Sequence, residues 1–420
     1  MKKKVLIIVE NLPVPFDTRV WKEAIALHQA DYEVTVLCPK GKGYEQGYEL
    51  LDGIHVYRHP MPKEGNSAVS YVWEYACALI WQFIYAAWIY LRRGFQVIQG
   101  CNPPDDIFMV ALPFKLFGVK YIFDHHDVNP ELYFSKYERY DFFYRVQMFL
   151  EKQTFRHSDI VISTNSSYRD IAVARGGINP EDIFVVRNGP DLTTFRPVPP
   201  NPAWKRGRRY LVGYVGTISI QEGLDILLEV VDSIKKSGRQ DVYFICVGGG
   251  PGLAGLEKMV QDKSLGDVVT FTGRIPDSDL LEILSTADVC VNPDKPCQMN
   301  DISTMIKIME YMALGKAIVQ FDLKEGRFSA QDASLYSSHD NRVADFGEKI
   351  LWLLDHPEER QRMGEFGFQR VRKQLAWEFS VPNLLAAYER AFAKVDGKRD
   401  LQTDVSVIEV DGTSDKLAGR

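Results

Sequence analysis

The chain has 420 residues, of which 45% are hydrophobic and 25% are charged, as in an ordinary globular protein. This length exceeds what one hydrophobic core usually serves, so we expect two domains. The formal net charge of −6 argues against a nucleic-acid partner, because binding DNA or RNA needs a basic face. The six cysteines show neither paired nor metal-ligand spacing, which indicates reduced thiols in a cytoplasmic protein.

Residues 1–190 alternate short buried strands with helical patterns. The apolar run at the N-terminus is too short for a signal peptide and no small-residue cleavage site follows, so we expect the first strand there. The alternation predicts an α/β domain with a doubly wound parallel sheet. Its strand-like runs are VLIIVE, EVTVLC, IHVYRH, FQVIQG, KYIFDHH, DIVIST and DIFVVRNG.

One segment of this half is unusually apolar. Residues 69–91 are almost wholly hydrophobic and are followed by Arg92 and Arg93. The run nearly spans a bilayer, but Glu74 and Gln82 interrupt it, so we favour a buried helix over a membrane span. A helix that lies on the membrane surface, with its basic end at the headgroups, stays open as an alternative for this segment.

The second half repeats the same alternation after a linker. Residues 191–209 are rich in proline and end in basic residues, which predicts a linker. Strands and helices then alternate over residues 210–376, so we expect a second Rossmann-like domain that faces the first across a cleft. The spacing of apolar residues over residues 377–394 predicts a last amphipathic helix. The tail at residues 395–420 is polar and aperiodic, and we expect it to be disordered.

Two loops of the first domain carry candidate functional residues. His126 and Asp127 follow a predicted strand, where an imidazole can donate to a sugar hydroxyl and be oriented by a carboxylate. Asp17, Thr18 and Arg19 stand at a predicted helix start, and the arginine offers a fork for phosphate or carboxylate. The alternatives are a loop histidine with a structural hydrogen bond and a helix cap with a surface arginine.

Glycines and arginines follow the strands of the second domain. Glycine turns there let the backbone approach a ligand. The arginines are candidates for phosphate binding, and the alternative for them is that they are surface cations without a ligand. A glutamate just beyond the last of these strands is a candidate acceptor from a sugar hydroxyl. No Ser-His-Asp series or zinc spacing emerges, so we expect neither metal nor cofactor. The candidates are Gly216, Gly248, Gly249, Gly250, Arg274, Glu325 and Arg327.

Residues 300–322 carry the most informative pattern in the chain. Ser303 and Thr304 are good N-cap types, and a helical run followed by a short buried strand comes after them. Lys307 and Glu310 share one helix face near the helix N-terminus, whose free N–H groups attract anions. The pattern predicts a site that holds a phosphate and a sugar hydroxyl together.

Taken together, these residues resemble glycosyltransferase family 4, whose members have the GT-B fold and move a sugar from a nucleotide donor with retention of configuration. The resemblance covers nearly the whole chain and is carried by KIMEYMALGKAIV, by the HD of HHDVNPE, by VGGGPG and by FTGRIPDSDLLEILSTADVCVNP. It implies that Glu310 holds the donor ribose and that His126 contacts the transferred sugar. It also implies that Arg274 and Ile275 lie at the base, beside the turn from Gly248 to Pro251.

Three departures from the family pattern concern the donor. The first glutamate of the family's pair is Ile302 here, the arginine and lysine that bracket the diphosphate are Thr217 and Glu222, and the usual first-loop glycines are replaced by Phe16–Arg19. A diphosphate without a positive partner is poorly held. We therefore hypothesise that other cations take over, together with the helix N-terminus at Ser303 and Thr304. These cations are Arg19, Arg274, Lys307 and Arg327.

The sequence thus predicts a cytoplasmic glycosyltransferase of the hexosyl or N-acetylhexosaminyl type. We expect a nucleotide-sugar donor, a UDP-sugar by preference, and a glycan or lipid-linked acceptor in surface polysaccharide synthesis. Residues 69–93 would give peripheral contact with the inner face of the membrane. Two alternatives stay open: a UDP-sugar epimerase on the same fold, and a weakly active or inactive nucleotide-sugar-binding partner, which Ile302, Thr217 and Glu222 favour.

Overall fold

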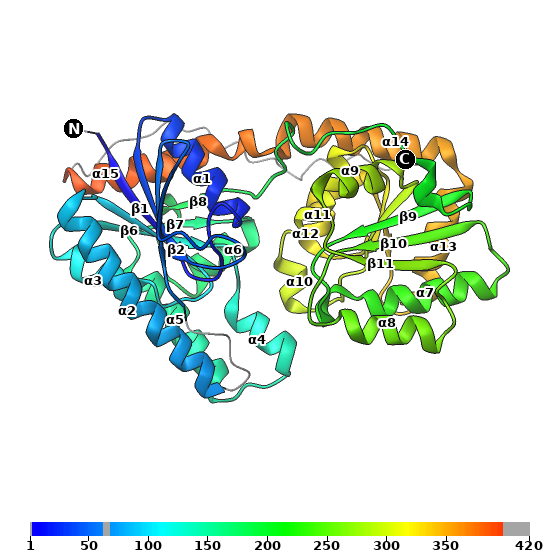
Figure 1. The fold of residues 1–420 in the computed structure, drawn as a ribbon, viewed down its shortest axis with the longest axis horizontal. Helices are drawn as coiled ribbons and strands as arrows, with labels where there is room; N and C mark the ends of the chain where they lie inside the picture. The colour runs from blue at the N-terminus through cyan, green and yellow to red at the C-terminus, as the bar shows by residue number, and fades with distance from the viewer. Residues whose placement is uncertain (1, 62–67, 398–420) are drawn as a thin grey trace, which may run out of the picture.

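The computed structural model describes residues 2–61 and 68–397 and consists of two lobes, each built on a parallel sheet covered by helices (Figure 1). This arrangement confirms the predicted α/β class with two doubly wound domains. The predicted disordered tail falls mainly on residues 398–420, which lie outside the described residues.

The first lobe contains an eight-stranded sheet in the order β3-β4-β2-β1-β5-β6-β7-β8. All neighbouring strands run parallel except β3, which pairs antiparallel with β4 at the edge. Apolar side chains pack on both faces, as expected for a sheet covered by helices on each side. The strands are β1 Lys4–Val9, β2 Glu33–Pro39, β3 Tyr48–Leu51, β4 Ile54–His59, β5 Val97–Cys101, β6 Lys120–His125, β7 Ile160–Ser163 and β8 Ile183–Val185.

Among the described residues before the linker, the helices of this lobe are α1 Thr18–Gln29, α2 Ala68–Arg92, α3 Phe108–Lys115, α4 Asn129–Tyr137, α5 Phe142–His157 and α6 Ser166–Ala174. The long helix α2 buries Ala78, Gln82, Ala86 and Ile89, which recur at helical spacing, against the sheet. Its opposite face stays exposed although it is apolar. In the part of the chain that the structure describes, no helix has both the length and the apolar character needed to cross a membrane.

The second lobe contains a six-stranded parallel sheet in the order β11-β10-β9-β12-β13-β14. Its strands are β9 Tyr210–Val215, β10 Val242–Val247, β11 Val269–Gly273, β12 Val289–Asn292, β13 Ile318–Phe321 and β14 Ser334–Ser337. Its helices are α7 Leu224–Lys236, α8 Leu253–Asp262, α9 Asp277–Thr286, α10 Gln298–Ile302, α11 Ile306–Ala313, α12 Lys324–Ala330, α13 Arg342–Asp355 and α14 Pro357–Arg370.

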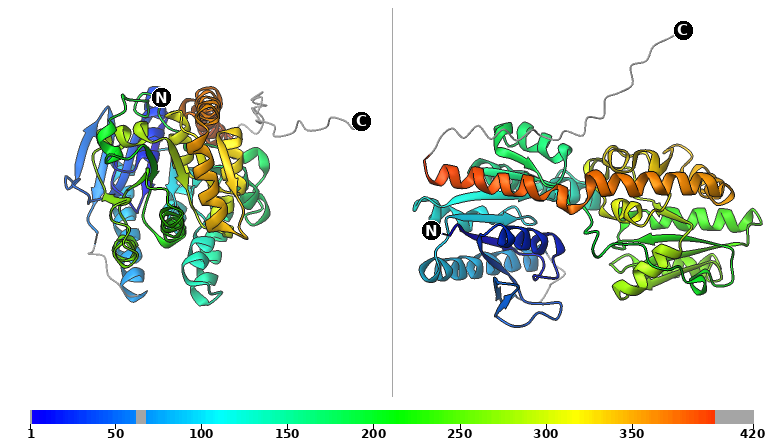
Figure 2. Two further views of the ribbon diagram at one scale, coloured as in Figure 1. Left: turned by 90° about the vertical axis from the view of Figure 1, so that its right-hand side faces the viewer. Right: turned by 90° about the horizontal axis from the view of Figure 1, so that it is seen from above.

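The C-terminal helices connect the two lobes. Helix α14 packs on the second lobe and α15 (Val381–Val395) on the first, and together they run along one side of both (Figure 2). Helix α15 contributes Leu384, Tyr388 and Phe392 to the first core, and the Tyr388 hydroxyl donates to the side chain of Gln99 on β5. The last helix that the structure describes is thus part of the first domain.

The order of each sheet reverses next to its first strand, at β1 and β5 in the first lobe and at β9 and β12 in the second. Ligands of open α/β sheets bind at the carboxyl ends of strands beside such switch points. The loops after these four strands therefore define where to look for the site.

The helix predicted after Ser303 and Thr304 differs in one respect. It is α11, which a separate short helix, α10, precedes, and Met305 rather than a hydroxyl residue is the N-cap of α11. The reason is that the hydroxyls have other partners. Ser303 Oγ donates to the carbonyl of Met299 at 2.6 Å, and Thr304 Oγ1 accepts from Nδ2 of Asn165 in the first lobe at 3.0 Å.

Candidate functional site

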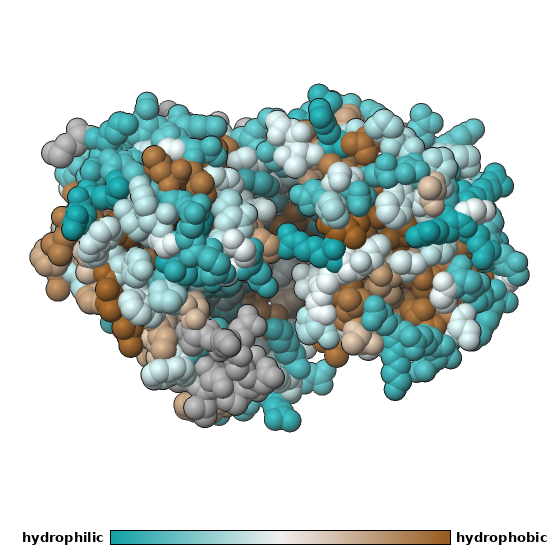
Figure 3. All heavy atoms as spheres, in the orientation of Figure 1, coloured by the Kyte–Doolittle hydropathy of each residue, from teal (hydrophilic) through white to brown (hydrophobic). Residues whose placement is uncertain are grey.

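A cavity of about 390 Å³ lies between the two lobes, and the surface is visibly hollowed there (Figure 3). First-lobe loops form one wall, and the segment around the start of α11 forms the other. The cavity brings together seven of the residues proposed from the sequence: Asp17, Thr18, Arg19, His126, Asp127, Ser303 and Thr304.

His126 is held at this wall by a tight turn at the end of β6. The side-chain oxygen of Asn102 accepts the backbone N–H groups of His126 at 2.8 Å and of Asp127 at 3.0 Å. The amide nitrogen of Asn102 in turn donates to the carbonyl of Asp127 at 2.7 Å. One side chain at the end of β5 therefore fixes the backbone of the turn.

The imidazole of His126 is oriented by a buried carboxylate two residues earlier. Nδ1 of His126 lies 3.1 Å from Oδ2 of Asp124. Burial opposes a proton on the ring, but the negative charge of Asp124 outweighs it and raises the pKa of His126 above its ordinary value. Because Nδ1 faces Asp124, Nε2 is the ring nitrogen left for a ligand, and it donates a hydrogen bond when the ring is protonated, the form that Asp124 favours.

Arg19 anchors Asp124 and does not extend freely into the cavity. Its Nε and Nη2 donate to the two oxygens of Asp124 at 3.1 and 2.7 Å, and Nη1 donates to the carbonyl of Val186 at 3.1 Å. Nη2 also lies 3.1 Å from Glu23 on the next turn of α1. The fork predicted to grip a phosphate is therefore engaged by carboxylates of its own domain.

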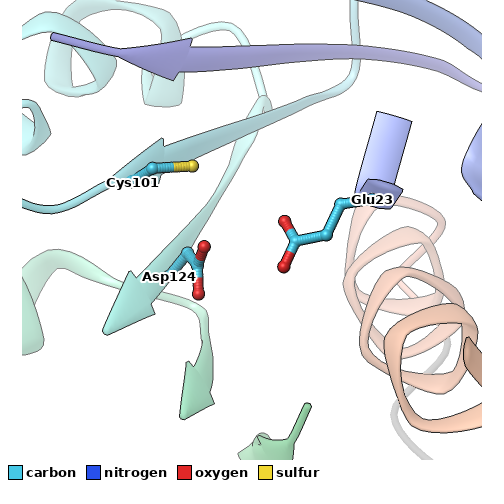
Figure 4. Close-up of side chains that lie close together, drawn as sticks. All are labelled: Glu23, Cys101 and Asp124. Atoms are coloured by element: carbon cyan, nitrogen blue, oxygen red, sulfur yellow. The ribbon is translucent and has the colours of Figure 1, made fainter. Parts of the chain in front are cut away.

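Glu23, Cys101 and Asp124 converge beneath this pair (Figure 4). Their ligand atoms lie within 4.8 Å of one another, a spacing that suits a metal ion. However, the Gln99 amide donates to Glu23 at 2.6 Å and to Cys101 at 3.3 Å, and Arg19 occupies Asp124. A metal would have to displace a guanidinium and an amide, so these residues form an internal hydrogen-bonded network.

The second lobe has a comparable buried network around Lys307. Its ammonium group donates to Glu222 and, at 2.8 Å, to Asp294. Glu222, which replaces the lysine of the family pattern, thus accepts a hydrogen bond from a lysine of another helix. The charge predicted at Lys307 is present, but two carboxylates of the same domain surround it.

The glycines after β9 and β10 are explained by packing between loops. A Cβ on Gly248 would lie 1.9 Å from the carbonyl oxygen of Gly216, and one on Gly250 would lie 2.3 Å from that of Ile218. Gly216 and Gly248 donate to the ends of β10 and β11 at 3.1 and 3.0 Å. Gly249 has open space around it. The loop is compact and leaves an exposed backbone beside the cleft.

Glu325 lies in the contact between the lobes. Its carboxylate is buried and accepts from Ser167 Oγ at 2.7 Å and from Thr304 Oγ1 at 3.3 Å, with Arg187 at 3.5 Å. The predicted role of accepting from a sugar is not what this geometry offers, because both oxygens face protein donors.

The remaining arginines differ in exposure and partners. Arg327 is exposed, donates to both oxygens of Asp322 at 2.7 and 2.6 Å, and does not line the cavity. Arg274 reaches from the end of β11 to the ring of Phe16 in the first lobe, 4.6 Å from its centre. Ile275 packs on the second core. Arg274 therefore spans the cleft, whereas Arg327 belongs to the surface.

Glu310 is half-buried on α11, one turn beyond the cavity wall at Ile306. Its carboxylate makes no hydrogen bond to any other residue that the structure describes. Burial raises its pKa to about 7, although the charges of Lys22 and Lys307 favour the ionised form. An unbonded carboxyl group in such a place suits a hydroxyl donor.

Sequence reasoning missed Asn102, Asp124 and Asp294, which hold the residues of the site in place. Asn102 and Asp294 follow the switch-point strands β5 and β12, so the loop positions themselves were a signal. Asp124 interrupts an otherwise apolar strand, which was a second signal.

Removing the Lys307 ammonium is expected to destabilise the second domain. Lys307→Met leaves Glu222 and Asp294 buried without a cation, which should lower the free energy of unfolding by about 3–5 kcal/mol near neutral pH. Urea unfolding of the single variant and of Lys307→Met/Glu222→Gln checks this, because the double variant should recover part of the loss. Equal losses in both variants would contradict the charge argument.

Protonation of His126 is expected to stabilise the fold at low pH. Since its folded-state pKa is raised, this contribution is fully present below the unfolded pKa of about 6.5 and is lost as pH rises through the folded-state value. The difference in unfolding free energy between wild type and His126→Gln should therefore shrink as the pH rises above the unfolded-state pKa of about 6.5. The exposed His339→Gln is the matched control; a pH-independent difference for His126→Gln would refute the assignment.

Comparisons with known proteins agree with this architecture. A family model described as "Glycosyl transferase 4-like domain" matches residues 17–189, and one described as "Glycosyl transferases group 1" matches residues 201–370. An alpha-maltose-1-phosphate synthase of Mycolicibacterium smegmatis is 24% identical over 66% of this chain and 75% of its own. Three further curated relatives match over 39%, 59% and 56% of their own lengths.

Solved structures show the same fold. A sucrose-phosphate synthase from Thermosynechococcus elongatus superposes with a TM-score of 0.77 at 18% identity, covering 93% of this chain and 100% of the other. HepE of Anabaena, solved in complex with UDP-glucose, gives 0.69 at 13% identity, covering 92% and 99%. Since both lobes match family models and the whole chain matches this fold, the protein belongs to glycosyltransferase family 4 and has the GT-B fold.

Proposed function

We propose that this protein transfers a sugar from a nucleoside-diphosphate donor to a hydroxyl group of an acceptor, in the cavity between the domains. The observation that carries the proposal is that His126 and the start of α11 line the same 390 Å³ space from opposite domains. A donor N–H on one side and free backbone N–H groups of a helix on the other suit a sugar joined to a phosphate.

Each end of the donor has a candidate partner. Nε2 of His126 donates to a hydroxyl of the transferred sugar, and Asp124 keeps the ring in that orientation. Glu310 accepts from the ribose, and the backbone at Gly249 and Ile275 borders the nucleotide. The acceptor oxygen then takes the place of the diphosphate at the anomeric carbon, with retention of configuration as the family resemblance implies.

The donor is proposed to be a UDP-sugar. The support is the HepE structure of the same fold, which was solved with UDP-glucose. Comparing the turnover of UDP-hexoses with that of UDP-N-acetylhexosamines identifies the class of sugar.

Nucleotide binding is expected to raise the thermal stability of the protein, because a ligand that binds only the folded state shifts unfolding by mass action. UDP, GDP and dTDP are compared, with UDP expected to give the largest shift. Glu310→Gln should reduce that shift, since a carboxylate contact to ribose hydroxyls is lost, and should weaken UDP about tenfold. The exposed Glu257→Gln on α8 is the control.

The outcome separates the alternatives. UDP-sugar turnover with an acceptor supports a transferase, whereas epimer formation from the donor alone indicates an epimerase. Tight binding without either reaction across an acceptor panel indicates an inactive partner. The absence of a shift with all three nucleotides would overturn the proposed donor class.

We further propose a lipid-linked glycan acceptor for surface polysaccharide synthesis, reached by peripheral contact with a membrane. The support is the outer face of α2, where Trp73, Ile80, Ile84, Trp88 and Leu91 are exposed. Hydrophobic side chains gather along this lower edge of the first lobe in Figure 3. Arg92 and Arg93 follow at the helix end, so aromatic and basic residues stand where an interfacial helix places them.

Membrane contact is tested by flotation with vesicles that contain anionic phospholipid. Wild type should float with them, and Ile84→Glu/Leu91→Glu should bind at least about tenfold more weakly, because two apolar side chains no longer enter the interface. Trp352→Glu changes an exposed apolar residue of the second lobe and is the control. Equal flotation of all three proteins would exclude α2 as the contact.

A further inference from the structure

Helices α1 and α11 both begin at the cavity, in opposite lobes. Thr18 and Ile306 line the cavity from opposite lobes. Lys22 follows Thr18 by four residues and Glu310 follows Ile306 by four, so each stands on the same helix face one turn further on. A cation of the first domain and a carboxyl group of the second therefore stand one helical turn beyond the two sides of the cavity.

Lys22 is not committed to an ion pair. Its Nζ donates to the carbonyl oxygen of Gly189 at 3.1 Å. Among residues 2–61 and 68–397, no carboxylate oxygen lies within 4.0 Å of this nitrogen. Burial lowers the pKa of Lys22, while the charges of Asp191 and Glu310 favour the protonated form. Two of its three N–H bonds are available to a ligand.

The side chains of Lys22 and Glu310 are close but do not touch. Each shifts the pKa of the other, and yet the pair is separated by more than the 4.0 Å of an ion pair. Asp277, which raises the pKa of Glu310, lies three residues after Arg274 on the second-lobe wall.

Other cations near the cleft are engaged by carboxylates. Arg19 is held by Asp124 and Glu23, Lys307 by Glu222 and Asp294, and Arg187 by Glu325. Arg274 differs, since its contact is the ring of Phe16. Lys22 from the first domain and Arg274 from the second are therefore the cations best placed to meet a phosphate without first breaking an ion pair.

We propose that Lys22 binds the phosphate next to the ribose of the nucleotide donor, so that the donor site is completed by a residue of the first domain. This inference rests on the proposed function. Its chemistry is a charge-assisted contact from ammonium to phosphate oxygen, beside a ribose held by Glu310. A nucleotide bound in this way contacts both domains and favours the closed arrangement of the cleft.

The experiment compares UDP with uridine on Lys22→Gln, Lys22→Arg and wild type by calorimetric titration. Lys22→Gln should weaken UDP about 10- to 100-fold, the usual loss for a hydrogen bond to a charged group, and leave uridine unchanged. Lys22→Arg keeps the charge and should restore most of the UDP affinity. Lys236→Gln, a lysine whose side chain is 75% exposed on α7, is the control and should bind UDP like wild type.

The outcomes separate this inference from the proposed function. If Lys22→Gln binds UDP as tightly as wild type does, Lys22 has no role in binding phosphate, and the proposed donor class stays intact. Equal weakening of UDP and uridine by Lys22→Gln also overturns it, because a loss without dependence on phosphate is structural. Wild type that binds neither UDP, GDP nor dTDP overturns both proposals. Unfolding temperatures without ligand verify that each variant is folded.

Discussion

The bidentate ion pair between Arg19 and Asp124 determines the geometry of the first-domain wall. It joins α1 to the end of β6, and the third donor of the guanidinium binds the carbonyl of Val186 beyond β8. A buried ion pair adds little net stability, since desolvation offsets most of the attraction, but removing one partner is costly. The pair therefore acts chiefly on position: it fixes the helix that carries Lys22 and the carboxylate that orients His126.

The second domain holds its wall of the cavity in place with a similar network of Lys307, Glu222 and Asp294. In both domains one buried cation is matched by two carboxylates below the loops at the switch point of the sheet. Each lobe thereby neutralises its own charges before any ligand arrives. What remains for an anionic ligand is a boundary group such as Lys22, because the facing carboxyl group of Glu310 lies beyond the 4.0 Å of an ion pair.

The sequence supported the fold more fully than the site. Alternating apolar strands and helices predicted both sheets, but β3 and β14 were missed. Both are edge strands of four residues with mixed polar and apolar side chains, so neither shows a buried run. Edge strands depend on a partner strand more than on local pattern, which a sequence does not display.

The sequence predicted residues of the cavity wall where the local chemistry is visible, and it mispredicted their contacts where the partners are distant in sequence. His126 follows a strand and was identified, whereas Arg19 was predicted to be a free fork because its partner Asp124 is 105 residues away. Thr304 was expected to cap a helix, but it bonds Asn165 from the other domain. Lys22 gave no signal, since a lysine on an amphipathic helix is normally a solvated residue.

Polar side chains join the two domains beside the cavity, and this has a consequence for substrate entry. Asn165 donates to the carbonyl of Ile302 at 2.9 Å, and the hydroxyl of Tyr168 lies 2.9 Å from that of Ser303. Ser167 and Glu325 add a third such contact. Water can replace these hydrogen bonds when the cleft opens, so breaking them costs little free energy. The same helix segment that limits the cavity can thus separate from the first domain while the two internal ion-pair networks keep each wall in its shape.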